Sequence, residues 1–314
     1  MTTAGRRDRP LMLALVGPTA SGKTGASIEI ARSLGAEIVA VDSMLVYRGM
    51  DIGTAKPTQK ERDAAPHHLL DVADPAGAFS VARYQSLARE AMAGIRGRGR
   101  TPLLVGGTGL YFRAIVDDLE LPGTEPALRR SLEAEAAVVG ADRLHARLAG
   151  FDPAAAAKIE VENVRRTVRA LEVAALTGRA FSSFATSWER FRADGVRAAG
   201  VRVPPPVLAG RIERRVRAMV AEGLLEEVRG LLDRGFERFL TATQAIGYLE
   251  VVEHLHGRLT LDEAMERTIR RTRALARRQM AWFRRDPRIR WFDAGEDGAE
   301  EVAADVVRYL GGGG

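Results

Sequence analysis

Short, nearly continuous apolar runs in the first third of the chain predict buried strands. They span residues 11–16 (LMLALV), 37–41 (EIVAV) and 102–105 (PLLV). Strands that are covered on both faces of a parallel sheet show such runs, rather than an alternation of apolar and polar residues. Helical spacing separates the runs at residues 23–34 and 82–95. Because strands and helices alternate, we expect a parallel α/β sheet.

The pattern changes in the middle of the chain. Residues 117–195 contain no predicted strand, and helical stretches rich in Ala, Glu and Arg are separated there by proline and glycine. This pattern is typical of a helical insertion. We therefore expect an α/β core formed by residues 1–116 and 196–314, with an inserted α-helical domain at residues 117–195.

The last third of the chain returns to the sheet and then becomes mostly helical. Residues 196–203 predict a further strand, which the prolines at 204–206 are expected to end. Helices dominate residues 210–285, and residues 289–292 predict a last short strand.

A phosphate-binding motif lies between the first predicted strand and the first helix. The pattern G-x-x-x-x-G-K-[ST] is matched by Gly17, Pro18, Thr19, Ala20, Ser21, Gly22, Lys23 and Thr24. In such a loop the backbone N–H groups meet phosphate oxygens at a helix N-terminus, the lysine adds positive charge, and the Thr24 hydroxyl can ligate Mg²⁺. The strand–loop–helix context favours this interpretation over a plain glycine turn. The loop does not identify the phosphate compound.

Two further polar residues follow predicted strands. Asp42 comes after the second strand and Thr108 after the third, at the sheet edge where open α/β proteins bind ligands. Asp42 is interpreted as a Mg²⁺ ligand or as a general base, and a helix-capping or solvated aspartate is the structural alternative. Thr108 is expected to reach the same crevice, with a local turn as its structural alternative.

A stripe of arginines follows one face of a predicted helix near the C-terminus. Its members are Arg267, Arg270, Arg271, Arg273, Arg277, Arg278, Arg284 and Arg285. At about 100° per residue they fall within an arc of about 160°, while Trp282 and Phe283 fall on the complementary arc, which is expected to pack. Few acidic residues stand at i,i+4 spacing, which favours contact with a phosphate backbone over a solvated basic face.

A second basic group and a pair of adjacent histidines are further candidate residues. Arg165, Arg166 and Arg169 form a second basic group within the predicted insertion. His67 and His68 are adjacent, so in extended structure their side chains point apart, which favours structural or substrate-positioning roles over a shared metal.

Composition narrows the class of protein. The 314 residues are 46% hydrophobic and 28% charged, which is typical of a globular protein. The formal net charge is 47 − 41 = +6, which suits a polyanionic partner. The absence of cysteine excludes disulfides and thiolate chemistry. No apolar run is long enough to span a bilayer. The apolar run after Arg6 and Arg7 is too short for a signal peptide, and cleavage after it would destroy the phosphate-loop motif. We therefore expect a cytoplasmic protein.

Taken together, seven segments resemble the tRNA dimethylallyltransferases, also called tRNA isopentenyltransferases or IPP transferases. The segments are GPTASGKT (17–24), VDSMLVYRGMDIGTAKP (41–57), PHHLLD (66–71), PLLVGGTGLY (102–111), VRRTVRALEV (164–173), QAIGY (244–248) and RRQMAWFRR (277–285). They occur in order over nearly the whole chain. The resemblance implies a P-loop NTPase-like parallel sheet core with an inserted helical domain that grips tRNA.

The resemblance also implies the reaction. A dimethylallyl group would pass from dimethylallyl diphosphate, with Mg²⁺ as cofactor, to the exocyclic amine of adenosine 37, just 3′ of the anticodon, in tRNAs that read codons starting with U. Asp42 would be the general base, and Thr108 and Arg215 would act on the diphosphate or the reacting centre. The implied tRNA contacts are Asp42, Ser43, Met44, Leu45, Thr108, Arg129, Arg165, Arg166, Thr167, Val168 and Arg169.

The residues found from patterns alone agree with this chemistry. An aryl amine is a poor nucleophile, and a carboxylate that accepts its proton improves it. The allylic carbon ionises readily when the departing diphosphate is stabilised by cations and loop amides. Three alternatives remain: an ATP-binding small-molecule kinase, a non-enzymatic RNA-binding module, and an adenylate isopentenyltransferase that acts on free nucleotide. We expect a monomer that binds the tRNA anticodon stem-loop.

Overall fold

The computed structural model describes residues 12–185, 191–192 and 195–313. The chain forms two compact units, one of Met1–Val116 with Ala193–Gly314 and one of Asp117–Arg192. The first residue of the first predicted strand, Leu11, and the basic pair Arg6 and Arg7 lie outside the described residues.

The larger unit is built on a six-stranded sheet with the strand order β3-β2-β4-β1-β5-β6, and each pair of neighbouring strands is parallel. The strands are β1 (Met12–Val16), β2 (Ala36–Val41), β3 (His67–His68), β4 (Thr101–Gly106), β5 (Val196–Arg202) and β6 (Ile289–Asp293). This confirms the predicted parallel α/β core. The two-residue edge strand β3 was not predicted, because two residues are too few to show a period.

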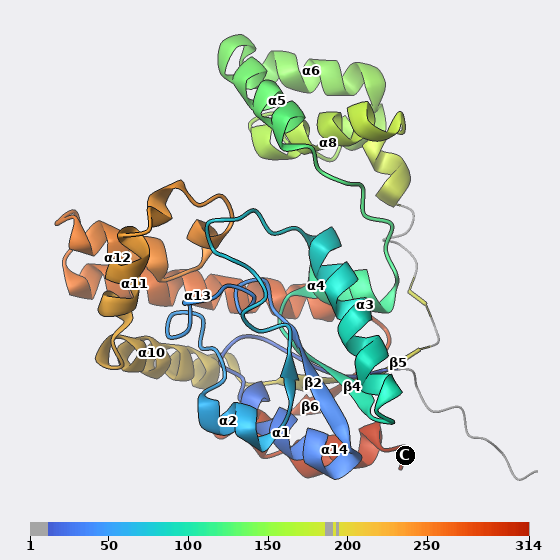
Figure 1. Ribbon diagram of the computed structural model, residues 1–314, viewed down its shortest axis with the longest axis vertical. Coiled ribbons are helices and arrows are strands. Elements are labelled where there is room, and N and C mark those ends of the chain that lie inside the picture. The colour runs from blue at the N-terminus through green and yellow to red at the C-terminus, as the bar shows by residue number, and fades with distance from the viewer. Residues whose placement is uncertain (1–11, 186–190, 193–194, 314) are drawn as a thin grey trace, which may run out of the picture. The chain divides into compact units, whose positions relative to one another are not determined.

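Both faces of this sheet are covered by helices (Figure 1). The helices of the larger unit are α1 (Lys23–Leu34), α2 (Gln59–Ala64), α3 (Val81–Gly97), α4 (Gly109–Val116), α10 (Pro205–Ala221), α11 (Leu224–Leu232), α12 (Tyr248–Leu255), α13 (Leu261–Phe283) and α14 (Ala303–Leu310). Short 3₁₀ turns occur at η2 (Phe236–Arg238), η3 (Ala242–Gln244) and η4 (Gly298–Glu300).

Alternate residues of each strand enter separate cores, which explains the continuous apolar runs. Val39 of β2 packs with α3, α4, α11 and α12 in one core. Ile38 packs with α1, α10 and α14 in the other. With both faces buried, the polar loops at the carboxyl ends of the strands are left to form a site.

The prolines at 204–206 have a second role that was not predicted, at the start of a helix. They do end β5, but Pro205 and Pro206 also form the first turn of α10. Proline suits this position, because the first N–H groups of a helix have no partner within the helix and the ring fixes φ near the helical value. Helix α10 therefore begins earlier than residue 210.

The smaller unit is entirely helical in its described residues. It contains α5 (Pro126–Val139), α6 (Ala141–Phe151), α7 (Pro153–Ala156), α8 (Val164–Thr177) and the 3₁₀ turn η1 (Phe181–Ala185). Leu132, Leu144, Leu148 and Leu171 meet in its own small core. In the described parts of both units, no helix is long and apolar enough to cross a membrane.

Candidate active site

The phosphate loop is held in shape by contacts on its outer side. The carbonyl of Ala20 accepts a hydrogen bond from Nε of Arg211 at 2.8 Å, and the carbonyl of Ser21 accepts one from the N–H of Ala299 at 2.7 Å. Ala20 lies in the left-handed region at φ 62°, and Gly22 caps α1 at φ 83°. Because these two carbonyls are bonded on the outer side of the loop, the other side of the loop faces the cavity at the N-terminus of α1.

Strands β2, β4 and β1 are neighbours in the sheet, so the residues that follow them meet at one edge. The N–H of Ser43 donates to Oγ1 of Thr108 at 3.2 Å, and the N–H of Thr108 donates to the carbonyl of Val41 at 3.2 Å. The structure therefore brings Thr108 beside Asp42, as the sequence predicted.

The Asp42 carboxylate uses its two oxygens differently. Oδ1 accepts hydrogen bonds from the N–H groups of Met44 at 2.8 Å and Leu45 at 3.4 Å. Oδ2 has no hydrogen-bond partner in the described part of the chain. Burial raises the pKa of Asp42, and the two amides and Lys23 oppose this shift. One oxygen thus stabilises the local turn, while the second oxygen is left for chemistry.

Lys23 and Arg215 lie close enough to influence each other electrostatically. Nζ of Lys23 donates to the carbonyl of Pro18 at 2.5 Å and to Oγ of Ser21 at 3.3 Å. Burial, and then the nearby Arg215, lower the pKa of Lys23 to about 7, while Asp42 acts in the opposite direction. The pKa of Arg215 is also lowered by burial. Two cations in one crevice would be relieved by an anionic ligand.

Two adjoining cavities converge on these groups. The larger has a volume of about 550 Å³ and is lined in part by Asp42, Thr108 and Arg215. The smaller has a volume of about 100 Å³ and is lined in part by Lys23 and Thr24. Asp42 and Arg215 line both. A phosphate group in the small cavity would therefore place an attached organic group in the large one.

The donor set of the small cavity suits Mg²⁺ held jointly with a phosphorylated ligand. Thr24 brings a hydroxyl and Asp42 a carboxylate to its wall. Within the described residues, no three His, Cys, Asp or Glu side chains cluster as a metal cage. Mg²⁺ often uses only one or two protein ligands and completes its shell with substrate phosphates and water. The residues present fit that arrangement.

Helix α13 joins the site through Gln279, whose role was not predicted from the sequence. Oε1 of Gln279 accepts a hydrogen bond from the N–H of Thr19 in the phosphate loop at 2.8 Å. A Cβ placed on Gly107 would lie 2.3 Å from Nε2 of Gln279, and one on Gly109 would lie 2.0 Å from Cδ1 of Trp282. The two glycines therefore let α13 approach the loop after β4.

Trp282 was expected on the packing face of this helix, and that expectation was wrong in part. The residue is 40% exposed, and it lines the large cavity together with Arg271, Arg278 and Gln279. Helical periodicity separates polar from apolar faces, but it does not distinguish a core from the wall of a cavity.

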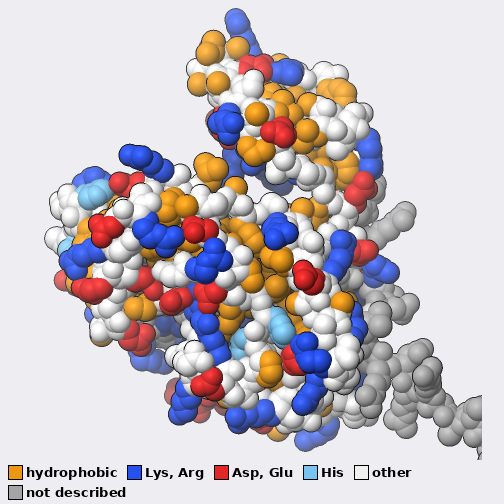
Figure 2. All heavy atoms as spheres, viewed as in Figure 1, with side chains coloured by type: hydrophobic (Ala, Val, Ile, Leu, Met, Phe, Trp, Pro, Cys, Tyr) orange, Lys and Arg blue, Asp and Glu red, His pale blue; other side chains and the backbone are white. Residues whose placement is uncertain are grey.

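The arginine stripe has more acidic partners than its sequence suggested. Arg270 pairs with Glu266 at i,i+4, while Arg271 and Arg273 pair across helices with Glu250 and Glu213. Helix α13 ends at Phe283, so Arg284 is its cap and Arg285 lies beyond it. On the face drawn in Figure 2, basic and acidic side chains are interspersed over the larger unit. Direct contact of the whole stripe with phosphates stays a prediction.

The smaller unit holds the other predicted RNA contacts in different environments. Arg165 and Arg166 are exposed at the start of α8, whereas Thr167 and Val168 are each 1% exposed. Arg169 donates to the carbonyls of Pro122 and Gly123 at 2.7 and 2.9 Å.

A buried carboxylate in this unit holds two of the predicted arginines. Glu172, which is fully buried, pairs with Arg169 at 2.7 Å and with Arg129 at 3.4 Å. Arg129 and Arg169 are thus oriented by the fold of the unit. Their contact with RNA stays a prediction.

The adjacent histidines separate as expected for neighbours in a strand. Nε2 of His68 lies 2.7 Å from Oε2 of Glu37, which also accepts from Nη2 of Arg98. His67 lines the small cavity, and its Nδ1 donates to the carbonyl of Ala65 at 2.7 Å. His68 has a structural partner, while His67 is placed to contact a ligand.

The fold and the site together define a P-loop-type α/β protein in which a carboxylate and two cations face a phosphate-binding cavity. Residues 45–286 match the family model described as IPP transferase, and the chain belongs to that family. It is 52% identical over 303 residues to a tRNA dimethylallyltransferase of Nocardioides sp., with 96% of each chain covered.

Solved structures show the same likeness. The full-length tRNA isopentenylpyrophosphate transferase of Bacillus halodurans is 41% identical, with a TM-score of 0.71 and 96% of each chain covered. A eukaryotic dimethylallyltransferase that acts on tRNA is 25% identical, with a TM-score of 0.75, over 91% of this chain and 74% of its own.

Proposed function

We propose that this protein transfers a dimethylallyl group from dimethylallyl diphosphate to the exocyclic amine of adenosine 37 in tRNAs that read codons starting with U. Membership of the IPP transferase family supports the transfer. The observation that carries the proposal is the meeting of Asp42, Thr108 and Arg215 on one cleft that adjoins the phosphate loop. A tRNA substrate also agrees with the expected cytoplasmic location.

In this proposal the diphosphate occupies the small cavity. Loop amides, Lys23 and Arg215 stabilise the negative charge that grows as the allylic C–O bond breaks. When bound by Thr24 and phosphate oxygens, Mg²⁺ supplies further positive charge to the diphosphate. No nucleotide hydrolysis is required, because the P-loop acts on a leaving group.

Asp42 is proposed to serve as the general base. The amine nitrogen gives its lone pair to the allylic carbon, forming the C–N bond, and its proton passes to Oδ2 of Asp42 as diphosphate departs. A raised pKa makes the carboxylate a better proton acceptor. Oδ1 is held by backbone amides, which fixes the direction of Oδ2. Thr108 lies beside this carboxylate and is proposed to position the amine.

The acceptor must bring its base into this cleft, which requires the nucleotide to leave its stack. We propose that the smaller unit grips the anticodon stem-loop through Arg165 and Arg166 on α8, with Arg129 and Arg169 as further contacts. Their charge suits the phosphate backbone.

One assay separates the alternatives. The protein is incubated with labelled dimethylallyl diphosphate and with tRNA, AMP or no acceptor. We expect label only in tRNA, and Lys23→Ala is expected to abolish transfer. Label in AMP would instead identify an adenylate isopentenyltransferase. Tight ATP binding without binding of the prenyl diphosphate would identify a kinase, and RNA binding without transfer a binding module.

A further inference from the structure

The segment Asp51–Ala55 forms part of the wall of the reaction cleft. Gly53, Thr54 and Ala55 line the large cavity, and Thr54 and Ala55 also line the small one. Ala55 lies in the left-handed region at φ 53°, which a non-glycine residue adopts at a cost. The conformation of this wall must therefore be imposed by its surroundings.

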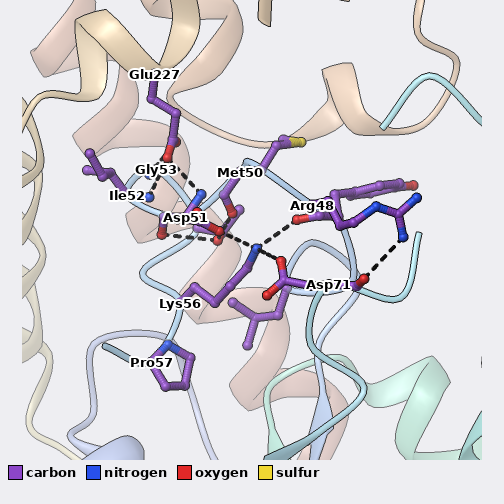
Figure 3. Close-up of polar contacts among 12 residues, drawn as sticks. Arg48, Met50, Asp51, Ile52, Gly53, Lys56, Pro57, Asp71 and Glu227 are labelled. Carbon is purple, nitrogen blue, oxygen red and sulfur yellow. Dashed lines mark hydrogen bonds and ion pairs between the residues drawn. The ribbon is translucent and has the colours of Figure 1, made fainter. Parts of the chain in front are cut away.

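Glu227 on α11 provides the main contact from outside the segment (Figure 3). Its Oε2 accepts hydrogen bonds from the N–H groups of Asp51 and Ile52, both at 2.8 Å. Its Oε1 accepts one from the N–H of Gly53 at 3.1 Å. One carboxylate thus binds three consecutive amides, and hydrogen bonds to a charged acceptor are stronger than neutral ones.

Tyr248, the first residue of α12, fixes the orientation of this carboxylate. Its hydroxyl donates to Oε1 of Glu227 at 2.6 Å, and the residue is completely buried. Burial and then Glu227 raise the pKa of Tyr248, so it stays a donor at neutral pH. A Cβ on Gly53 would lie 2.5 Å from the tyrosine ring, so glycine is required there.

A second charged anchor holds the other side of the segment. Nζ of Lys56 binds Oδ1 of Asp51, Oδ1 of Asp71 at 2.6 Å and the carbonyl of Tyr47 at 2.7 Å (Figure 3). The Lys56 side chain is only 1% exposed. The wall is therefore fixed between a buried cation and the Glu227 carboxylate.

Glu227 itself lines neither cavity, so its influence on a ligand passes through the segment that it holds. We propose that Glu227 is a positioning residue for the transfer reaction. By binding the amides of Asp51, Ile52 and Gly53, it fixes the cleft wall against which donor and acceptor are oriented. The inference rests on the proposed function for its kinetic consequence, while the anchoring itself is a property of the fold.

The test compares Glu227→Gln with Glu226→Gln, since the neighbouring Glu226 forms an exposed pair with Arg229 on the same helix. Glutamine keeps the shape of the side chain but places an N–H₂ donor where acceptors are needed. We expect kcat of Glu227→Gln to fall about 10- to 100-fold, as for misplaced reacting groups. Affinity for inorganic diphosphate should fall by a smaller factor than kcat, because the phosphate loop that carries Lys23 is a separate segment, although Thr54 and Ala55 also line the small cavity. Glu226→Gln should match the wild type.

Hydrogen exchange in residues 51–53 gives a readout that does not depend on activity. We expect these amides to exchange at least about tenfold faster in Glu227→Gln than in the wild type. Tyr248→Phe, which removes one hydrogen bond to Glu227, should show a smaller effect in the same direction, and Glu227→Asp should recover part of kcat.

Three outcomes would overturn the inference. They are an unchanged kcat in folded Glu227→Gln, unchanged exchange at these amides, or a fall of kcat and diphosphate affinity in the same proportion. An inactive wild type would overturn the proposed function instead, and the exchange comparison would still test the anchoring.

Discussion

The backbone N–H of Thr19 in the phosphate loop donates a 2.8 Å hydrogen bond to Oε1 of Gln279, which stands 260 residues later in the chain. This bond links the loop to the arginine-bearing helix α13. Gln279 is 8% exposed and lines both cavities. The helix whose arginines are predicted to contact RNA is thus joined directly to the phosphate-binding loop.

Replacing Gln279 with leucine should therefore weaken the fold. The amide of Thr19 would lose its partner in a partly buried site, which costs about 1–2 kcal/mol of the free energy of unfolding. Urea unfolding followed by circular dichroism measures the change, with the exposed Gln59→Leu on α2 as the matched control. Equal midpoints for the two variants would contradict the importance of this bond.

Asp42→Asn tests the general base. Asparagine keeps the size and can still accept the amide hydrogen bonds, but it cannot take the proton. We expect tRNA affinity near that of the wild type and a single-turnover rate lower by roughly 10² to 10⁴. Asp63→Asn, an exposed change on α2, serves as the control. A loss confined to Mg²⁺ or donor affinity would make Asp42 a metal ligand.

Lys23 should take up a proton when diphosphate binds. Its pKa of about 7 in the free protein leaves it mostly neutral at pH 8, and a bound anion would raise that pKa again. Affinity should therefore fall as pH rises above 7, by up to about tenfold per unit. Titration calorimetry at pH 8 in two buffers should show about one more proton taken up by the wild type than by Lys23→Met. Equal uptake would refute the assignment.

The lowered pKa of Lys23 also affects the free energy of unfolding of the protein without ligand. Because the folded-state pKa lies below the ordinary 10.5, the unfolded chain binds more protons between pH 7 and 10.5. This group therefore makes the folded state gain stability as pH rises through that window. Diphosphate should oppose the trend by favouring the charged lysine.

Arg165→Ala combined with Arg166→Ala should weaken tRNA binding and flatten its salt dependence. Each lost phosphate contact lowers the log–log salt slope by about 1, so a decrease of about 2 is expected. Arg169 is left unchanged, because it is tied to Glu172 and to backbone carbonyls. Arg147→Ala, which removes an exposed pair with Glu135, is the control. Unchanged affinity and slope in a folded variant would identify a merely solvated basic face.

The sequence determined those parts of the protein whose cause is local. Residues 38–41 and 102–105 form buried strands because every side chain there is compatible with a core on one face or the other. The phosphate loop is defined by eight consecutive residues, and its place between β1 and α1 follows from the order of the chain. The positions of Asp42 and Thr108 followed from one rule, that parallel strands end at the same edge.

Tertiary structure alone decided which distant groups meet. The pairing of Arg271 with Glu250, the contact of Gln279 with Thr19 and the anchoring of Gly53 by Glu227 all join separate elements. A hydrogen bond requires its donor and acceptor atoms to lie within about 3 Å. The packing of the helices sets that distance, and the periodicity of neither sequence segment shows it. For the same reason Trp282 was assigned to a core, although the close approach of α13 to Gly109 places it on the wall of the cleft.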